Sequence, residues 1–557
     1  MMEAVSSLPC CVQCIGTVLV LYLLWTFIVK RLIFSGKSKE PPIHKQNWEK
    51  DVVYLYQFPR PRYVPNLSPY CLKVETWLRL AGVEYEVVGS MRLRSREGKM
   101  PFVELNAKHY HDSTLIIRHL TEAFHRKDME GDTDEDKAIS ILIQEMIEKP
   151  VWTVVFFSAE SSRGSLLWWL EYLRPLTKGY MRRRVEEMVA VMGVGGHHLH
   201  EEELTKAAEE YMFALSIMLG DKPFILGDQP KSIDATVFGH LASIYYLPTF
   251  PSDSPIHRLI NGLPCCVQCI GTVLALYLLW TFILKRLIFS GKPKEPPIHK
   301  QDWEKDVVYL YQFPRPRYVP NLSPYCLKVE TWLRLTGVKY EIVESRRLRS
   351  REGKMPFVEL NGKHYHDSTL IVRHLTEAFD KKDMEGDTDK DKATSILVHE
   401  LIERPFLAFN AYCRIYRNPE SYMSSDVFGL WWMDYARPLF KGFFKNWAQN
   451  VVEVMGVGGH HMNEEELIKE AEECMFALST MMSDKPFILG NQPKSIDAAV
   501  FGHLASIYYL PTFPNDSPMH RLINDTPNVK AYLDRVKTRV YPDWDGVVAK
   551  GGDKKTD

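Results

Sequence analysis

The chain has almost no net charge. Its 69 lysine and arginine residues are balanced by 70 aspartate and glutamate residues, which leaves a formal charge of −1. A protein that binds nucleic acid or an anionic membrane through its overall field carries a clear excess of basic residues. The composition therefore argues against nucleic acid as a partner. The length of 557 residues leaves room for several domains of roughly 100–200 residues each.

A disulfide framework is also missing. Eight of the ten cysteines are accounted for by two apolar segments and one repeated motif: Cys10, Cys11, Cys14, Cys265, Cys266 and Cys269 in or beside the segments, and Cys71 and Cys326 in the motif. Such usage is typical of a reducing compartment rather than of a secreted protein.

Charged residues are missing from residues 10–29 and again from residues 265–284, and a Lys-Arg pair ends each run. About twenty apolar residues are what a helix needs to cross the hydrocarbon core of a bilayer. A cleaved signal peptide fits poorly, because no basic region precedes the first run and no small-residue cleavage site follows it. The sequence predicts a transmembrane helix at 10–29 and a second apolar helix at 265–284; the alternative is a buried core helix.

Basic residues follow both apolar segments, so the positive-inside rule places each following domain in the cytoplasm. These two placements conflict if both segments span, because the chain would then cross back and leave its second half outside. Either the second segment does not cross, or the two halves are separate gene products that have been joined. We predict a membrane protein whose soluble domains face the cytoplasm.

One design is present twice in the chain. Tyr54 corresponds to Tyr309 with an offset of 255, and after a gain of eight residues Asp234 corresponds to Asp497 with an offset of 263. A repeat this long indicates two tandem modules, since solenoid units have only ~20–50 residues. The first module lacks a counterpart of residues 528–540, so a terminal helix is missing where the modules join.

Each module begins with a pattern of strands and helices. β-Branched and aromatic residues at 51–58 and at 83–88 predict two strands, and a helix between them ends at Gly82. Residues 99–114 predict a hairpin with an asparagine-centred turn. Asp112 or Ser113 is suited to cap the helix that follows.

The rest of each module is predicted to be helical. Helical spacing begins at Asp136, and Ser232 with Asp234 opens a late helix as a capping element. The predicted domains are 51–125 and 136–261 in the first module and 306–380 and 391–547 in the second. The fold class is α/β followed by all-α.

Four stretches, each repeated in the second module with at most one change, carry a family pattern. They are Ser-Pro-Tyr-Cys-Leu-Lys-Val-Glu at 68–75, Gly-Lys-Met-Pro-Phe-Val-Glu-Leu-Asn at 98–106, Asp-Ser at 112–113 and Ser-Ile-Asp-Ala-Thr-Val-Phe-Gly-His-Leu at 232–241. With this order of elements they resemble the glutathione-transferase superfamily, and within it the failed axon connections homologues, which are related to metaxins and cadmium-resistance proteins. The resemblance implies a thioredoxin-like domain followed by a helical domain.

The resemblance implies two competing functions. One is a binding or adaptor role in axonal development, carried out through protein partners; a homodimer and the mitochondrial outer membrane both fit this role. The other is an active serine-type glutathione transferase, or a detoxifying enzyme of the cadmium-resistance kind. The two functions are distinguished by whether each module has all of the residues that contact glutathione in transferases.

The motif at 68–71 has the spacing of the glutaredoxin Cys-Pro-Tyr-Cys motif, but Ser68 replaces the first cysteine, and Ser323 does so in the second module. The cysteine at the helix N-terminus is the one whose thiolate is stabilised, so dithiol redox chemistry is not expected. A serine here either donates a hydrogen bond to the thiolate of bound glutathione or only caps the helix. We expect Cys71 to be a packed small hydrophobe.

The resemblance assigns further glutathione contacts. Met100-Pro101 fits the cis-proline position, and Asp112-Ser113 fits the position that holds the γ-glutamyl end; in the second module these are Met355, Pro356, Asp367 and Ser368. Arg92, Arg94, Arg96 and Lys99 either bind the glycyl carboxylate or form a solvated loop. The interval before Pro101 is short, which predicts that the usual second helix is reduced.

Two other features carry weaker signals. The histidine-rich stretch at 195–200 loses one histidine in the second module, so a metal site is not expected. His109 is expected to pack rather than to act in catalysis. Residues 151–189 and 406–452 diverge between the modules. In the superfamily that the chain resembles, this region forms the wall of the acceptor pocket. Two substrate preferences, relaxed constraint or swapped exons explain the divergence equally.

Overall fold

The computed structural model describes residues 43–148, 201–245, 298–419, 441–452, 464–510 and 517–552, apart from residues 62, 63, 67, 96, 97, 351, 352, 443 and 450. The predicted membrane helices at 10–29 and 265–284 lie outside these residues. So do the first module's divergent stretch and both histidine-rich stretches. No helix in the described ranges is long and apolar enough to cross a membrane.

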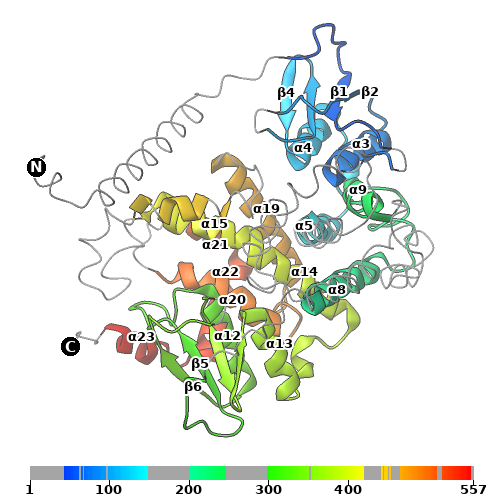
Figure 1. Ribbon diagram of the computed structural model, residues 1–557. Coiled ribbons are helices and arrows are strands. Elements are labelled where there is room, and N and C mark those ends of the chain that lie inside the picture. Colours follow the sequence, from blue (N-terminus) through cyan, green and yellow to red (C-terminus); the bar gives the residue numbers. More distant parts are fainter. Residues whose placement is uncertain are drawn as a thin grey trace, which may run out of the picture.

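Each module begins with a four-stranded mixed sheet. In the first module the strand order is β2-β1-β3-β4, with β1 parallel to β2 and antiparallel to β3 (Figure 1). The elements are β1 (Val53–Gln57), α3 (Pro69–Ala81), β2 (Tyr85–Gly89), β3 (Phe102–Leu105), β4 (Lys108–His111) and α4 (Ser113–Ala123). No helix lies between β2 and β3 among the described residues, as the short interval predicted.

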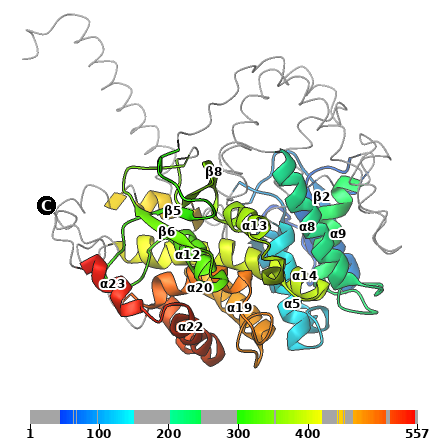
Figure 2. The same ribbon diagram turned by 90° about the horizontal axis from the view of Figure 1, so that it is seen from below.

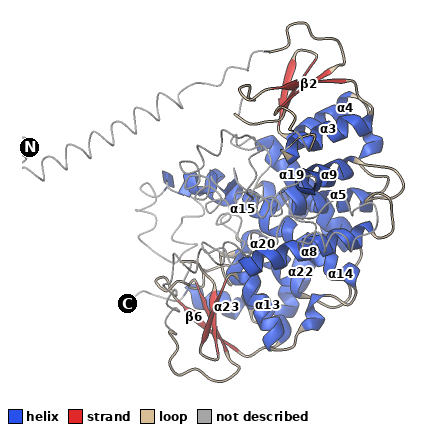
Figure 3. Cartoon of the chain, turned by 45° about the vertical axis from the view of Figure 1, so that its right-hand side comes forward, coloured by secondary structure: helices blue, strands red, loops and turns tan. Residues whose placement is uncertain are grey.

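The second module repeats this sheet, with order β6-β5-β7-β8. Its elements are β5 (Val308–Gln312), α12 (Pro324–Thr336), β6 (Tyr340–Glu344), β7 (Phe357–Leu360), β8 (Lys363–His366) and α13 (Ser368–Ala378). Figure 3 shows the two strand-bearing domains at opposite ends of the molecule, with helices between them.

The helical part of the first module comprises η1 (Lys127–Met129), α5 (Asp134–Met146), α8 (Glu201–Leu219) and α9 (Ser232–Tyr245). In the second module the helices are η3 (Lys382–Glu385), α14 (Asp389–Leu401), η4 (Ile402–Phe406), α15 (Leu407–Ala411), η5 (Tyr412–Arg417), α19 (Glu464–Met482), α20 (Ser495–Tyr508), α21 (Pro518–Asn524), α22 (Pro527–Val540) and α23 (Trp544–Gly552). The fold class of two thioredoxin-like and helical modules is confirmed.

A close contact between α3 and α9 joins the two halves of the first module. A Cβ atom on Gly239 would lie 2.7 Å from the backbone nitrogen of Lys73, so only glycine allows the helices to approach this closely. The indole nitrogen of Trp77 donates a hydrogen bond of 2.9 Å to the hydroxyl of Ser232 across the same contact. Gly502 allows the same close approach between α12 and α20 in the second module.

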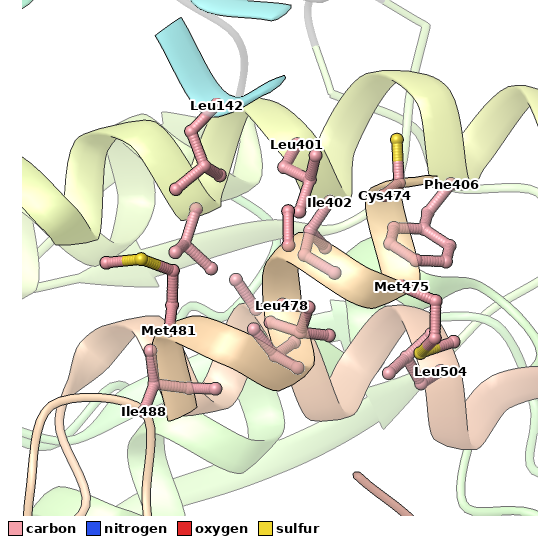
Figure 4. Packing of buried hydrophobic residues seen from close by; sticks show 14 of the residues in the cluster. Leu142, Leu401, Ile402, Phe406, Cys474, Met475, Leu478, Met481, Ile488 and Leu504 are labelled. Carbon is pink, nitrogen blue, oxygen red and sulfur yellow. The ribbon is translucent and has the colours of Figure 1, made fainter. Parts of the chain in front are cut away.

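The two modules pack against each other through helices that alternate between them. α8 of the first module packs on α14 of the second, and α19 packs on α5 (Figure 2). Leu142 of α5 lies in one apolar cluster with Leu401 and Leu478 of the second module (Figure 4). Two reciprocal ion pairs border the contact: Arg118 with Glu473 at 2.7 Å and Arg373 with Glu210 at 2.8 Å.

The segment before β1 is fixed to the sheet by a buried carboxylate. Glu104 on β3 is 1% exposed and accepts hydrogen bonds from the backbone nitrogens of His44 at 2.8 Å and Lys45 at 3.0 Å. The hydroxyl of Tyr56 donates a third bond of 2.8 Å to the same carboxylate. Glu359 holds the second module's connector with the same partners.

The second module contains α22, for which the sequence of the first module has no counterpart. Val529, Tyr532, Leu533 and Val536 are each 0–1% exposed, so they form the buried apolar face of this helix. The hydroxyl of Tyr532 donates a hydrogen bond of 3.1 Å to the carbonyl oxygen of Asp497 at the start of α20.

Candidate functional site

Ser68 lies at the N-terminus of α3, as predicted, and caps it. Its hydroxyl oxygen accepts a bond of 3.4 Å from the backbone nitrogen of Cys71, and Ser323 caps α12 through Cys326 at the same distance. Pro69 occupies the first helical position, and Gly82 ends the helix in the left-handed conformation. Ser68 therefore acts as a helix cap. It does so through its oxygen as an acceptor, so the cap does not use the hydroxyl proton.

Cys71 is fully buried, and burial raises the pKa of its thiol to about 11. The same cause raises the pKa of Cys326 to about 12. A thiol with such a pKa is protonated at neutral pH and is a poor nucleophile. The prediction that Cys71 packs as a small hydrophobe is confirmed.

The Met100–Pro101 and Met355–Pro356 peptide bonds are cis, as expected from the position of the prolines. Arg94 is held nearby: its guanidinium lies 5.3 Å from the ring centre of Phe58 and donates to the carbonyl oxygen of Leu93 at 2.7 Å. Arg92 and Lys99 are exposed, and Arg96 lies outside the described residues. Among the described residues of the basic cluster, Arg94 is the one held by these contacts.

Asp112 caps α4 from a backbone with φ of 67°. One carboxylate oxygen accepts bonds from the backbone nitrogens of Thr114 at 2.9 Å and Leu115 at 3.2 Å. Asp367 does the same for α13, and burial raises its pKa. Two N–H groups of the helix terminus therefore already bind a carboxylate of the chain itself, a site that would otherwise attract the carboxylate of a ligand.

Beside this cap lies a charged pair that the sequence did not lead us to predict. The Lys73 ammonium group donates to Glu148 at 2.5 Å and to the Thr114 hydroxyl at 2.9 Å. The side chain of Lys73 is 2% exposed and that of Glu148 is 11% exposed. The spacing of Pro69, Lys73 and Trp77, four residues apart along the buried side of α3, is the signal that would have revealed a buried lysine.

In the second module a histidine joins this cluster. His399 occupies the position of Gln144, and its Nε2 lies 3.0 Å from the Lys328 ammonium nitrogen and 3.2 Å from Glu403. Burial works against a charged imidazole, but the Glu403 carboxylate, with a further contribution from Glu400, outweighs it and raises the pKa of His399 to about 9. The two modules therefore differ in charge at otherwise matching sites.

The remaining predicted residues have structural roles. His109 stacks on Phe102 with ring centres 4.6 Å apart, and burial lowers its pKa to about 4; packing is confirmed. Asp234 accepts bonds from the backbone nitrogens of Ile225 at 2.9 Å and Lys231 at 2.8 Å, as expected for a capping element. Within the described ranges no three His, Cys, Asp or Glu side chains are arranged to hold a metal ion.

Family models match both modules in the same order. A glutathione S-transferase N-terminal domain model matches residues 69–160 and 324–421. A glutathione S-transferase C-terminal domain model matches residues 208–268 and 471–536. The tandem arrangement seen in the sequence is therefore found independently.

The chain is similar to several known proteins, three of which illustrate the range. Failed axon connections of Drosophila melanogaster is 32% identical over 277 residues, which are 47% of this chain and 66% of that protein, just under two thirds of it. Isoprene-epoxide–glutathione S-transferase of Rhodococcus is 27% identical over 39% of this chain and 93% of the relative. Metaxin-2 of Mus musculus is 20% identical over 44% of this chain and 92% of the relative.

Proposed function

The chain belongs to the failed axon connections family, in the metaxin-like part of the glutathione-transferase superfamily, and has the module twice; from this premise we propose that it is a binding or adaptor protein. Its partners are other proteins, which it engages without turning over glutathione. The name of the Drosophila relative supports a role in axonal development.

One observation carries the proposal. Asp112, which the resemblance places with Ser113 at the γ-glutamyl end of glutathione, is bonded through its carboxylate to the N–H groups of Thr114 and Leu115. The nearest buried cation, Lys73, is paired with Glu148. A ligand carboxylate would have to displace one of these partners, and a buried charge left without its partner is costly. The arrangement suits a folded scaffold better than an open cofactor site.

Calorimetric titration of the full chain with glutathione tests this proposal. We expect no saturable heat at millimolar glutathione and no transfer to an electrophilic aromatic acceptor. The Asp112→Ala variant is the matched comparison, because it frees the two N–H groups. Saturable binding and turnover by the unaltered chain would contradict the adaptor function.

The alternative, a serine-type glutathione transferase, has its own support. Ser68, Pro101 and Asp112 have the same geometry as Ser323, Pro356 and Asp367. One relative is named as a glutathione S-transferase. Turnover that falls at least tenfold in Ser68→Ala/Ser323→Ala would favour this function.

We also propose that residues 10–29 anchor the chain with its modules on the cytoplasmic face of a membrane. The uncharged run and the basic residues after it support this orientation, and the metaxin relatives support the mitochondrial outer membrane. Protease added to intact mitochondria should digest both modules. Protection of the first module until the membrane is lysed would contradict the orientation.

A further inference from the structure

In the second module, α22 and α23 cover the outer side of α12 and α20. Phe501 of α20 is 0% exposed and packs on the rings of Tyr541 and Trp544, with centres 5.9 and 6.5 Å away. The hydroxyls of Thr331 and Tyr541 share a hydrogen bond of 3.0 Å. This face is therefore closed by a terminal helix and the aromatic residues that follow it.

The first module has the same face without that helix. Phe238 and Thr76 correspond to Phe501 and Thr331. Phe238 is 37% exposed, and the residues that would form the covering helix have no counterpart before the second apolar segment. One exposed large side chain is ordinary on a protein surface, so the inference depends on the other groups that this face has in common with the second module.

Charge complementarity distinguishes this face from a merely apolar one. Arg334 donates to Asp543 at 2.7 Å and stacks on Tyr541, with its guanidinium carbon 4.4 Å from the ring centre. Its side chain is 16% exposed, whereas that of the corresponding Arg79 is 63% exposed. Arg79 bonds Glu75 on its own helix, as Arg334 bonds Glu330. Within the described part of the first module, no acidic residue takes the place of Asp543 as a partner of Arg79.

Further polar groups that receive the α22 segment are retained in the first module. Arg535 donates to the carbonyl oxygen of Pro486 at 2.6 Å, and Arg539 donates to Gln492 at 2.9 Å. The corresponding acceptors are Pro223 and Gln229. The first module therefore presents the apolar, cationic and acceptor groups of an α22 binding face in the same order.

We propose that the face formed by α3 and α9 of the first module is a docking site for an amphipathic helix of a separate protein. That helix has the chemistry of residues 527–544: apolar residues at spacings of three and four, then an aromatic pair that flanks an acidic residue. It lies across Phe238 and pairs its acidic residue with Arg79. This site is distinct from the N-terminus of α3 and goes beyond the adaptor function by stating what kind of partner binds and where.

A second copy of this chain is the less suitable occupant. Each chain has one α22 and two faces, so a helix donated to another copy leaves its own α12 and α20 uncovered. The exchange gains no contacts, and the tether favours the intramolecular position through its high effective concentration. A helix supplied by another polypeptide has no such competition.

The test uses a fluorescent peptide of residues 526–552 titrated into the full chain in detergent. We expect saturable binding of one peptide per chain, because the second module's face is already occupied. Phe238→Glu should weaken binding at least tenfold. Phe476→Glu is the matched control, since Phe476 on α19 is also 37% exposed, and it should leave binding unchanged. A peptide with Leu533→Asp should not bind.

Each other outcome overturns the proposal. No saturable binding means that the face is closed by the chain's own residues. Binding that Phe238→Glu does not affect means that the peptide docks elsewhere. Concentration-dependent dimers of the unaltered chain that Phe238→Glu abolishes would identify a second copy as the occupant. A circular dichroism spectrum unchanged by Phe238→Glu separates loss of the site from loss of folding.

Discussion

The hydroxyl of Tyr211 in the first module donates a hydrogen bond of 2.9 Å to the carboxylate of Glu400 in the second. Glu400 also accepts a bond of 2.7 Å from Arg404. The corresponding residues on the other side of the contact are Cys474 and Glu145, and a thiol is a weaker donor than a phenol. The two modules are thus joined by an unequal interface, although their helices pack reciprocally.

Tyr211→Phe should destabilise the contact between the modules. Glu400 is 6% exposed, and removing a donor to a buried carboxylate costs roughly 1–3 kcal/mol. The measurement is the free energy of unfolding in denaturant, with Tyr509→Phe as control, because the hydroxyl of Tyr509 bonds Asp534 at the surface. Equal losses in the two variants would mean that the bond across the modules has no special weight.

The stability of the chain should fall with rising pH through a group in the second module. The pKa of His399 is raised to about 9, so its stabilising contribution is complete below its ordinary pKa of about 6.5 and is lost as pH rises through about 9. His399→Gln gives the second module the residue that the first has at Gln144. This variant should lose that part of the pH dependence.

Unfolding free energies at pH 6 and pH 9.5 check this expectation. His125→Gln, at an exposed histidine, is the control and should keep the slope of the unaltered chain. Lys328, Glu400 and Glu403 surround His399, so the variant must be compared at both pH values rather than at one. An unchanged slope would show that His399 has no net linkage to folding.

Lys73→Met should be strongly destabilising. It leaves the Glu148 carboxylate, 11% exposed, without its cation, and breaking a buried pair in this way costs about 3–5 kcal/mol. The double variant Lys73→Met/Glu148→Leu should recover most of the loss, because neither charge is then buried alone. Thermal unfolding of the four members of the cycle measures the coupling. A double variant as unstable as the single one would show that Lys73 is needed for its packing and not for its charge.

Ser68→Ala and Ser323→Ala should each cost about 0.5–2 kcal/mol, the usual value of a helix cap. Both hydroxyls accept one bond of 3.4 Å from the helix, so the two losses should be equal. If glutathione binds, Ser68→Ala should also raise the pKa of its thiol by about one to two units, which thiolate absorbance in the ultraviolet measures. An unchanged thiol pKa would leave Ser68 only its role as a cap.

The local pattern was sufficient to predict the elements that build the site. The cap at Ser68, the terminus at Gly82 and the hairpin before Asp112 depend on neighbouring residues, and the structure has them at those positions. Lys73 and Glu148 were not predicted, because they lie 75 residues apart and meet only after α3 and the helical half have packed. The interface between the modules was not predicted either, because its apolar residues have the same spacing as ordinary core positions within one module.

The clamp that Glu104 forms on His44 and Lys45 has a mechanical consequence. Any tension that reaches the module from its N-terminal side enters through this connector. The hydrogen bonds from the backbone nitrogens of His44 and Lys45 to the Glu104 carboxylate transfer it to β3 before β1 is loaded. Because β3 is paired with β1 on one side and β4 on the other, the force is shared by the middle of the sheet. A module held in this way resists being peeled open from its edge, and Glu359 gives the second module the same protection.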